Sequence, residues 1–156
     1  LQRLYLSRTD LSDESLPTIA KLTNLRQLHL PAANISDAGL ARFKPLKKLL
    51  VLHLQDAAFT EQGLRHLRGL SALTRLKLDN NRIGDAGMAH LTPLKKLKYL
   101  SITSTFVSDV GLKHLAEIKS LKNLYLQNTK TTAQGVADLQ KMLPNCKIES
   151  DFASVQ

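Results

Sequence analysis

Two histidines, His29 and His53, are the residues whose type and spacing come closest to a metal site, because they stand at the same position in two successive copies of a sequence repeat. Asp56 or Asp79 could add a carboxylate ligand beside them. The sequence has no convincing set of further ligands to complete the tetrahedral coordination that zinc requires. We therefore expect no metal ion at these histidines, and no cofactor elsewhere.

Catalytic motifs are absent from the sequence. It contains no G-x-S-x-G elbow, no H-E-x-x-H pair, no glycine loop for a phosphate and no cysteine–histidine pair at a usable spacing. Cys146 is the only cysteine, which excludes an internal disulfide and a cysteine-based zinc site. The sequence therefore predicts a protein that is not an enzyme.

Composition indicates one domain with a leucine-rich core. The chain has 156 residues, of which 43% are hydrophobic but only 4% are aromatic, with no tryptophan. No apolar run approaches the roughly 20 residues that a membrane span needs, so we expect no membrane partner.

One short motif recurs six times in a single register. The copies are "LSDESLPTI", "ISDAGLARF", "FTEQGLRHL", "IGDAGMAHL", "VSDVGLKHL" and "TTAQGVADL", which start at Leu11, Ile35, Phe59, Ile83, Val107 and Thr131 and so keep a constant period. A leucine triplet precedes every copy at the same distance: Leu1-Leu4-Leu6, Leu25-Leu28-Leu30, Leu49-Leu52-Leu54, Leu73-Leu76-Leu78, Leu97-Leu100-Ile102 and Leu121-Leu124-Leu126.

The combined pattern L-x-x-L-x-L-x-x-[N/T]-x-[L/I] resembles the leucine-rich repeat over residues 1 to about 148. The [S/T]-D-x-G-L segment resembles the 24-residue repeats of bacterial arrays, which are close to the ribonuclease-inhibitor-like and cysteine-containing types. The resemblance implies a right-handed α/β solenoid whose six coils start at residues 1, 25, 49, 73, 97 and 121. It also implies an exported or cell-envelope protein, although the sequence shows no targeting segment and leaves the compartment open.

Local chemistry agrees with this fold. The alternation in L-x-L is typical of a strand with one buried face. A serine or threonine then stands where a helix N-cap belongs, and an acidic residue follows it at the positive end of the helix dipole. Glycines recur at 39, 63, 87, 111 and 135, although each costs a helix about 1 kcal/mol. We therefore expect adjacent coils to approach too closely there for a side chain.

Stacked coils should form a parallel sheet on a concave face and a row of short helices on the convex face, because helices are wider than the spacing between strands. We expect a partial strand near 146–149, since Ile148 falls one repeat after Leu124, and a C-terminal tail over 149–156.

The first coil has no cap, because Leu1 begins directly on a strand. We therefore expect a preceding repeat or domain. Leu4, Leu6, Leu11 and Leu16 are expected to be exposed in this chain and to promote self-association.

The outward strand positions are the candidate binding surface. They include all three tyrosines, whose large area and polar tip suit protein interfaces, although tyrosine also favours strands for its own sake. We expect a partner protein to contact Tyr5, His29, His53, Arg75, Lys77, Tyr99, Asn123 and Tyr125.

The net charge of +9 indicates a second candidate surface. In three of the repeats, lysines lie between the helix and the next strand, opposite the acidic helix starts, which predicts one basic and one acidic edge. The basic edge is represented by Lys47, Lys48, Lys95 and Lys96. It is either a solvated edge or a docking edge for an acidic partner. We do not expect a nucleic-acid site, because no reading helix or stacking aromatic platform accompanies these lysines.

Two functions remain open. The first is a non-catalytic module that binds a partner protein, or a neighbouring domain, on the concave face. The second is the recognition arm of a larger enzyme or electron-transfer protein. Phe106 is an additional apolar residue at a loop position that is polar, charged or alanine in the other repeats, and it is either a loop contact or an interaction residue.

Overall fold

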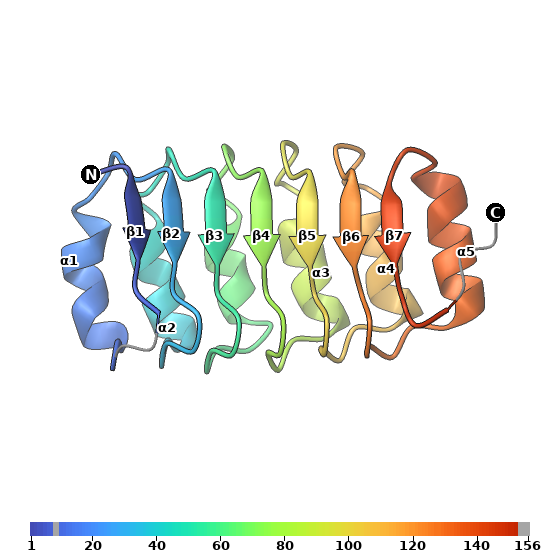
Figure 1. Ribbon diagram of the computed structural model, residues 1–156, viewed down its shortest axis with the longest axis horizontal. Helices are drawn as coiled ribbons and strands as arrows, with labels where there is room; N and C mark the ends of the chain where they lie inside the picture. The colour runs from blue at the N-terminus through green and yellow to red at the C-terminus, as the bar shows by residue number, and fades with distance from the viewer. Residues whose placement is uncertain (8–9, 153–156) are drawn as a thin grey trace.

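A computed structural model describes residues 1–7 and 10–152, and it contains one sheet of seven parallel strands in chain order (Figure 1). The strands are β1 (Arg3–Tyr5), β2 (Gln27–His29), β3 (Val51–His53), β4 (Arg75–Lys77), β5 (Tyr99–Ser101), β6 (Asn123–Tyr125) and β7 (Lys147–Glu149). Residues one repeat apart are partners throughout, as in Leu4↔Leu28 and Leu124↔Ile148. Thr9 of the repeat pattern and residues 153–156 of the expected tail lie outside the described residues.

A row of short helices lies behind the sheet (Figure 1). The α-helices are α1 (Leu16–Ala20), α2 (Asp37–Leu40), α3 (Asp85–Leu91), α4 (Asp109–Leu115) and α5 (Ala133–Met142). Three 3₁₀ helices, η1 (Asp13–Ser15), η2 (Ala41–Phe43) and η3 (Gly63–Leu67), complete the row, and η3 is the helix of the third repeat. Among the described residues, no helix is both long and apolar enough to cross a bilayer.

The core lies between the two layers and consists mainly of leucine. The central leucine of each strand from β2 to β6 is fully buried, while the residues on either side of it point to the opposite face. The helices contribute pairs three positions apart, such as Met88 with Leu91 and Leu112 with Leu115, all at 0–2% exposure. Each leucine buried in this way adds roughly 1.5–3 kcal/mol of hydrophobic stabilisation.

The acidic residue at each helix start bonds to the next coil. The Asp85 carboxylate accepts hydrogen bonds from the Ser108 amide and the Ser108 hydroxyl, both at 2.7 Å. It also accepts from the Gly111 amide at 2.9 Å. One side chain therefore satisfies three donors in the following repeat, at a helix start whose amides have no intrahelical partners.

The same bonds recur along the molecule, and we call the series the carboxylate ladder. Its other members are Asp13 to Ser36, Asp37 to Thr60, Glu61 to Gly84 and Asp109 to Thr132. Each carboxylate accepts the backbone amide of its partner, and each serine or threonine partner adds its hydroxyl. Gly84 has no hydroxyl, so Glu61 accepts only its amide, at 3.0 Å.

The ladder explains the repeated glycines. A β-carbon on Gly111 would lie 2.6 Å from Asp85 Oδ1 and 2.7 Å from Val107 Cγ1, well inside van der Waals contact. Gly39 and Gly135 would contact the ladder carboxylates of Asp13 and Asp109 in the same way. The expected close approach of adjacent coils is confirmed. The approaching group is the ladder carboxylate at Gly39, Gly63, Gly111 and Gly135, and the Leu64 side chain at Gly87.

Two expectations about the surface were wrong. Leu11 and Leu16 are buried by the chain's own coils, at 6% and 0% exposure, whereas Leu4 and Leu6 are only partly buried against the core. The apolar surface expected to drive self-association is therefore smaller than the sequence suggested, because η1 and α1 cover one side of the first coil.

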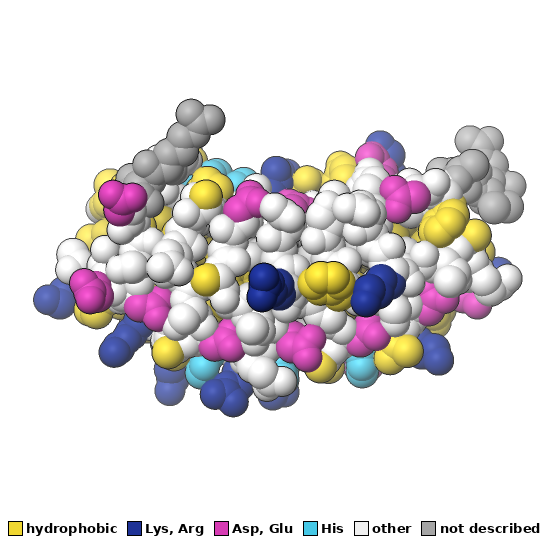
Figure 2. Space-filling view, turned by 90° about the horizontal axis from the view of Figure 1, so that it is seen from below, with side chains coloured by type: hydrophobic (Ala, Val, Ile, Leu, Met, Phe, Trp, Pro, Cys, Tyr) yellow, Lys and Arg dark blue, Asp and Glu magenta, His cyan; other side chains and the backbone are white. Residues whose placement is uncertain are grey.

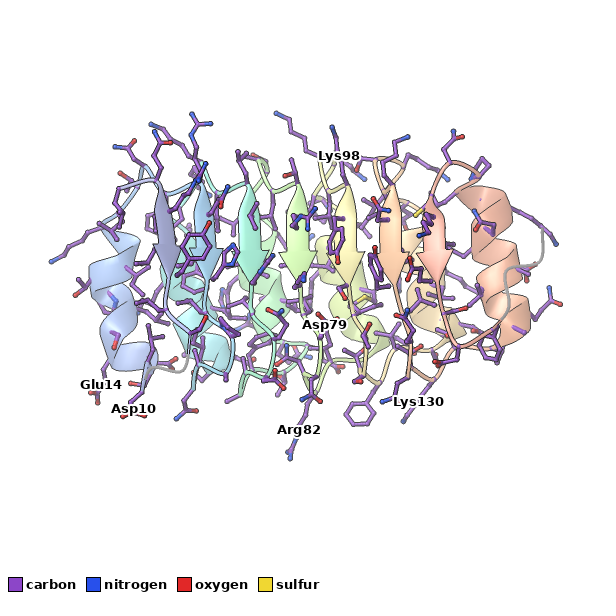
Figure 3. The ribbon with its side chains drawn as sticks, in the orientation of Figure 1. Asp10, Glu14, Asp79, Arg82, Lys98 and Lys130 are labelled. Carbon is purple, nitrogen blue, oxygen red and sulfur yellow. The ribbon has the colours of Figure 1, made fainter. Side chains whose placement is uncertain are left out.

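The edge at the C-terminal ends of the strands is not uniformly acidic. Arg82 and Lys130 extend from the same edge as Asp10 and Glu14, which lie several coils away at the N-terminal end, whereas Lys98 lies at the opposite edge (Figure 3). Basic and acidic side chains are intermixed there (Figure 2).

Replacing Gly111 by valine should lower the free energy of unfolding by about 1–3 kcal/mol, because the new side chain would displace Asp85 from its donors. Helix propensity opposes this effect, since glycine is the poorer helix former. Lys113→Val, at an exposed position of the same helix, is the matched control. Equal urea midpoints for the two variants would contradict the close-approach explanation.

Candidate functional site

All eight residues expected on the binding surface lie on strands β1 to β6 and flank the buried central leucines. They therefore share the outward face of the sheet, opposite the helices, which we call the sheet face (Figure 1). Strand pairing places them side by side: Tyr5 is the partner of His29, His29 of His53, and His53 of Lys77. In the neighbouring row Arg75, Tyr99 and Asn123 follow one another.

The first half of the sheet face is an aromatic stack. The Tyr5 and His29 rings pack edge to face with centroids 4.3 Å apart, and the His29 and His53 rings lie 3.9 Å apart. The Tyr5 hydroxyl donates to Gln27 Oε1 at 2.6 Å. Tyr5 is nevertheless 53% exposed, so it presents a large apolar ring for contact.

The second half combines two cations with two tyrosines. The Arg75 guanidinium lies over the Tyr99 ring at 4.2 Å, and Lys77 Nζ lies 5.9 Å from the same ring. The Tyr99 and Tyr125 rings are 5.1 Å apart. Cation–π contact holds the Arg75 side chain along the sheet without neutralising its charge.

The electrostatics of the sheet face favour neutral histidines. Burial, then His29, Lys77 and Arg75, lowers the pKa of His53 to about 4. Burial and Lys77 also lower the pKa of His29. Burial and Tyr125 raise the pKa of Tyr99, so the tyrosine stays neutral as well. Between β2 and β6, the positive charge of the sheet face at neutral pH therefore comes from Arg75 and Lys77.

The described residues contain no group of three or more histidine, cysteine or acidic side chains that could hold a metal ion. Asp79 accepts hydrogen bonds from the Ser101 hydroxyl and the Thr103 amide, and Asp56 accepts from the side-chain amide of Asn80. The two carboxylates considered as metal ligands are thus engaged elsewhere. His29 Nε2, His53 Nε2 and Gln55 Oε1 are buried and make no hydrogen bond within the described structure.

The basic-edge lysines do not form part of the sheet face. Lys47 Nζ donates to the Gly69 carbonyl at 3.1 Å, and Lys48 Nζ donates to Asn24 Oδ1 at 2.7 Å, both in neighbouring coils. Lys95 and Lys96 are exposed in the loop before β5. These four residues lie on the loops between helices and strands, as the sequence predicted.

Sequence reasoning singled out Phe106 but missed its contact with a cation of the next repeat, on the opposite edge. Phe106 is 55% exposed, and Lys130 Nζ lies 5.0 Å from its ring centre. Arg82, Phe106 and Lys130 occupy the same position in successive repeats. That shared repeat position is the signal that could have grouped them, and the structure leaves both explanations of Phe106 open.

Cys146 is poorly suited to thiol chemistry. It is 3% exposed, and burial raises the pKa of its thiol to about 11. The reactive thiolate is therefore scarce at neutral pH.

Comparison with known proteins decides the fold. A sequence profile described as "Leucine rich repeat" matches residues 71–130. The chain has the leucine-rich repeat fold. A leucine-rich repeat protein of Leptospira interrogans superposes with a TM-score of 0.74 at 23% identity, covering 96% of this chain and 37% of that one. Internalin C2 of Listeria monocytogenes superposes with a TM-score of 0.71 at 24% identity, covering 99% of this chain and 74% of that one.

The search of curated proteins gives no match. This chain spans only 37% of the Leptospira protein. At these identities the superpositions establish the fold, and the 24-residue bacterial repeat subtype remains a prediction.

His53 should make stability depend on pH. Its folded pKa of about 4 lies below the ordinary 6.5, so the unfolded chain takes up the proton first as the pH falls. The stabilisation is present above pH 6.5 and is lost between pH 6.5 and about 4. Urea unfolding of the native chain and of His53→Gln across this window should show a flatter dependence for the variant. The same slope in both proteins would contradict the pKa assigned to His53.

Proposed function

We propose that this chain is a non-catalytic protein-binding module and that its sheet face contacts the partner. The observation that supports the proposal most directly is the continuous row of aromatic and cationic side chains across β1 to β6. Tyrosine and arginine are the residues that most often dominate interface energies. Leucine-rich repeat proteins are commonly protein-interaction modules, which supports the class of function.

The geometry favours the sheet face over a catalytic centre. Aromatic stacking and strand pairing fix the rings before a partner arrives, so little side-chain entropy is lost on binding. The titratable residues of this face are histidines with lowered pKa values beside two cations. A histidine with a pKa of about 4 is a weak general base at neutral pH, because the ideal catalytic pKa lies near the operating pH.

The basic edge is the competing surface. Its lysines are exposed, but two of them are bonded to neighbouring coils, which is the behaviour of a solvated edge. Single exposed cations contribute little to affinity and are screened by salt. We therefore place the main contact on the sheet face.

A capture experiment tests the proposal. Immobilised native chain should recover a partner from extracts of the source cell, and a variant with Tyr5, Tyr99 and Tyr125 changed to alanine should lose it. Each anchoring tyrosine should cost about 2 kcal/mol or more of binding free energy. The control for the basic edge is a variant with glutamine at Lys47, Lys48, Lys95 and Lys96. The control for the helical side is a variant with alanine at His66, His90 and His114.

Thermal unfolding should first show that all variants fold. Recovery of the same partner by the tyrosine variant, together with its loss in the edge variant, would refute the sheet-face assignment and favour the basic edge.

A further inference from the structure

Among the described residues, neither Arg75 nor Lys77 forms an ion pair. The ion pairs among the described residues are Lys141 with Asp138 and Lys147 with Glu149, and neither involves β4. The outward positions of β2 to β6 include these two cations and no carboxylate. Asp79, just after β4, already accepts the Ser101 hydroxyl and the Thr103 amide. The outward positions of β3 to β5 therefore carry two positive charges and no negative one, and the Asp79 carboxylate beyond the end of β4 forms an ion pair with neither cation.

A partner that covers this face must compensate those charges. Arg75 and Lys77 lie between the Tyr5–His29–His53 stack and the Tyr99–Tyr125 pair, so a protein contacting both aromatic groups would cover β4 as well. Removing an ammonium or guanidinium from water without a partner charge costs several kcal/mol. Carboxylates placed opposite the two cations would offset that cost and add charge-assisted hydrogen bonds.

We propose that the sheet face binds an acidic segment of a partner protein, with partner carboxylates at Arg75 and Lys77 and apolar side chains on the flanking aromatic rings. This inference rests on the proposed function and adds the chemistry of the partner. The position of Arg75 against Tyr99 supports it, because the cation–π contact orients the guanidinium while leaving its charge available.

A nucleic acid fits the same observations less well. Nucleic-acid proteins commonly neutralise about 6–10 phosphates, and each contact needs a cation near the backbone. The middle of the sheet face supplies two. The neighbouring outward positions Val51, Ser101 and Asn123 are uncharged and cannot extend a phosphate track.

Two synthetic peptides test the inference on the intact chain. One alternates glutamate and tyrosine, and the other replaces every glutamate by glutamine. The amide resonances of the ¹⁵N-labelled protein report both affinity and position. The glutamate peptide should shift amides of β3 to β5 and bind at least about tenfold more tightly than the glutamine peptide at low salt.

A charge-matched pair of variants identifies the cations. The double variant Arg75→Gln with Lys77→Gln should bind the glutamate peptide about tenfold or more weakly than the native chain does. Arg42→Gln with Lys113→Gln removes the same charge from exposed helical positions and should change affinity by less than about twofold.

Each contrary result has a distinct meaning. Equal binding of both peptides at β3 to β5 would overturn the acidic-segment inference and leave the sheet-face function standing. Amide shifts confined to the loops of Lys47 and Lys95 would overturn both the acidic-segment inference and the sheet-face function. Absence of any shift at high peptide concentration would overturn the inference, as would an oligothymidylate of equal charge that displaces the glutamate peptide from β4.

Discussion

Coil-to-coil attachment through the carboxylate ladder is the constraint on which this structure depends. A single coil has too little apolar surface to fold alone, so each coil must be held against the next. Strand pairing holds one side of the stack. On the other side the helices are short and one repeat has only a 3₁₀ helix, so helix packing alone would leave the spacing loose. The carboxylate that accepts an amide and a hydroxyl of the next N-cap fixes the spacing there.

This fixed spacing has a direct consequence for the surface. Because residues one repeat apart become strand partners, side chains that are distant in sequence come into ring contact across the sheet. Such contacts explain why His29 and His53 are neutral and why Arg75 lies flat against Tyr99. The proposed binding face is therefore an outcome of the repeat period, since a change of one residue in that period would turn these side chains into the core.

Much of this could be predicted from the sequence because the repeat never changes register. The strands, the leucine core, the glycine contacts and the grouping of the sheet-face residues all follow from moving one repeat along the chain. The hydrogen-bond partners of the ladder carboxylates could not be predicted in this way. In the sequence, Asp85 is placed to interact with the helix dipole of its own coil. Only the relative position of two neighbouring coils shows that its hydrogen-bond partner is Ser108.

The repeat pattern also could not predict the directions of side chains or the shapes of loops. The turn after each of strands β2 to β6 places Ala32, Asp56, Asn80, Ser104 or Asn128 at positive φ, a conformation that no single shared residue type predicts. The burial of Leu11 and Leu16 depends on how η1 and α1 fold over the first coil. The edge that contains the helix starts was expected to be acidic, but Arg82 and Lys130 extend from it as well.

A double-mutant cycle on Asp85 and Ser108 tests the ladder most directly. Unfolding free energies would be measured in urea for the native chain, Asp85→Ala, Ser108→Ala and the double variant. The 2.7 Å bond between the Asp85 carboxylate and the Ser108 hydroxyl predicts a coupling of about 1–2 kcal/mol between the two side chains. Additivity within about 0.3 kcal/mol would show that the two side chains act independently and would contradict the ladder as the constraint that spaces the coils.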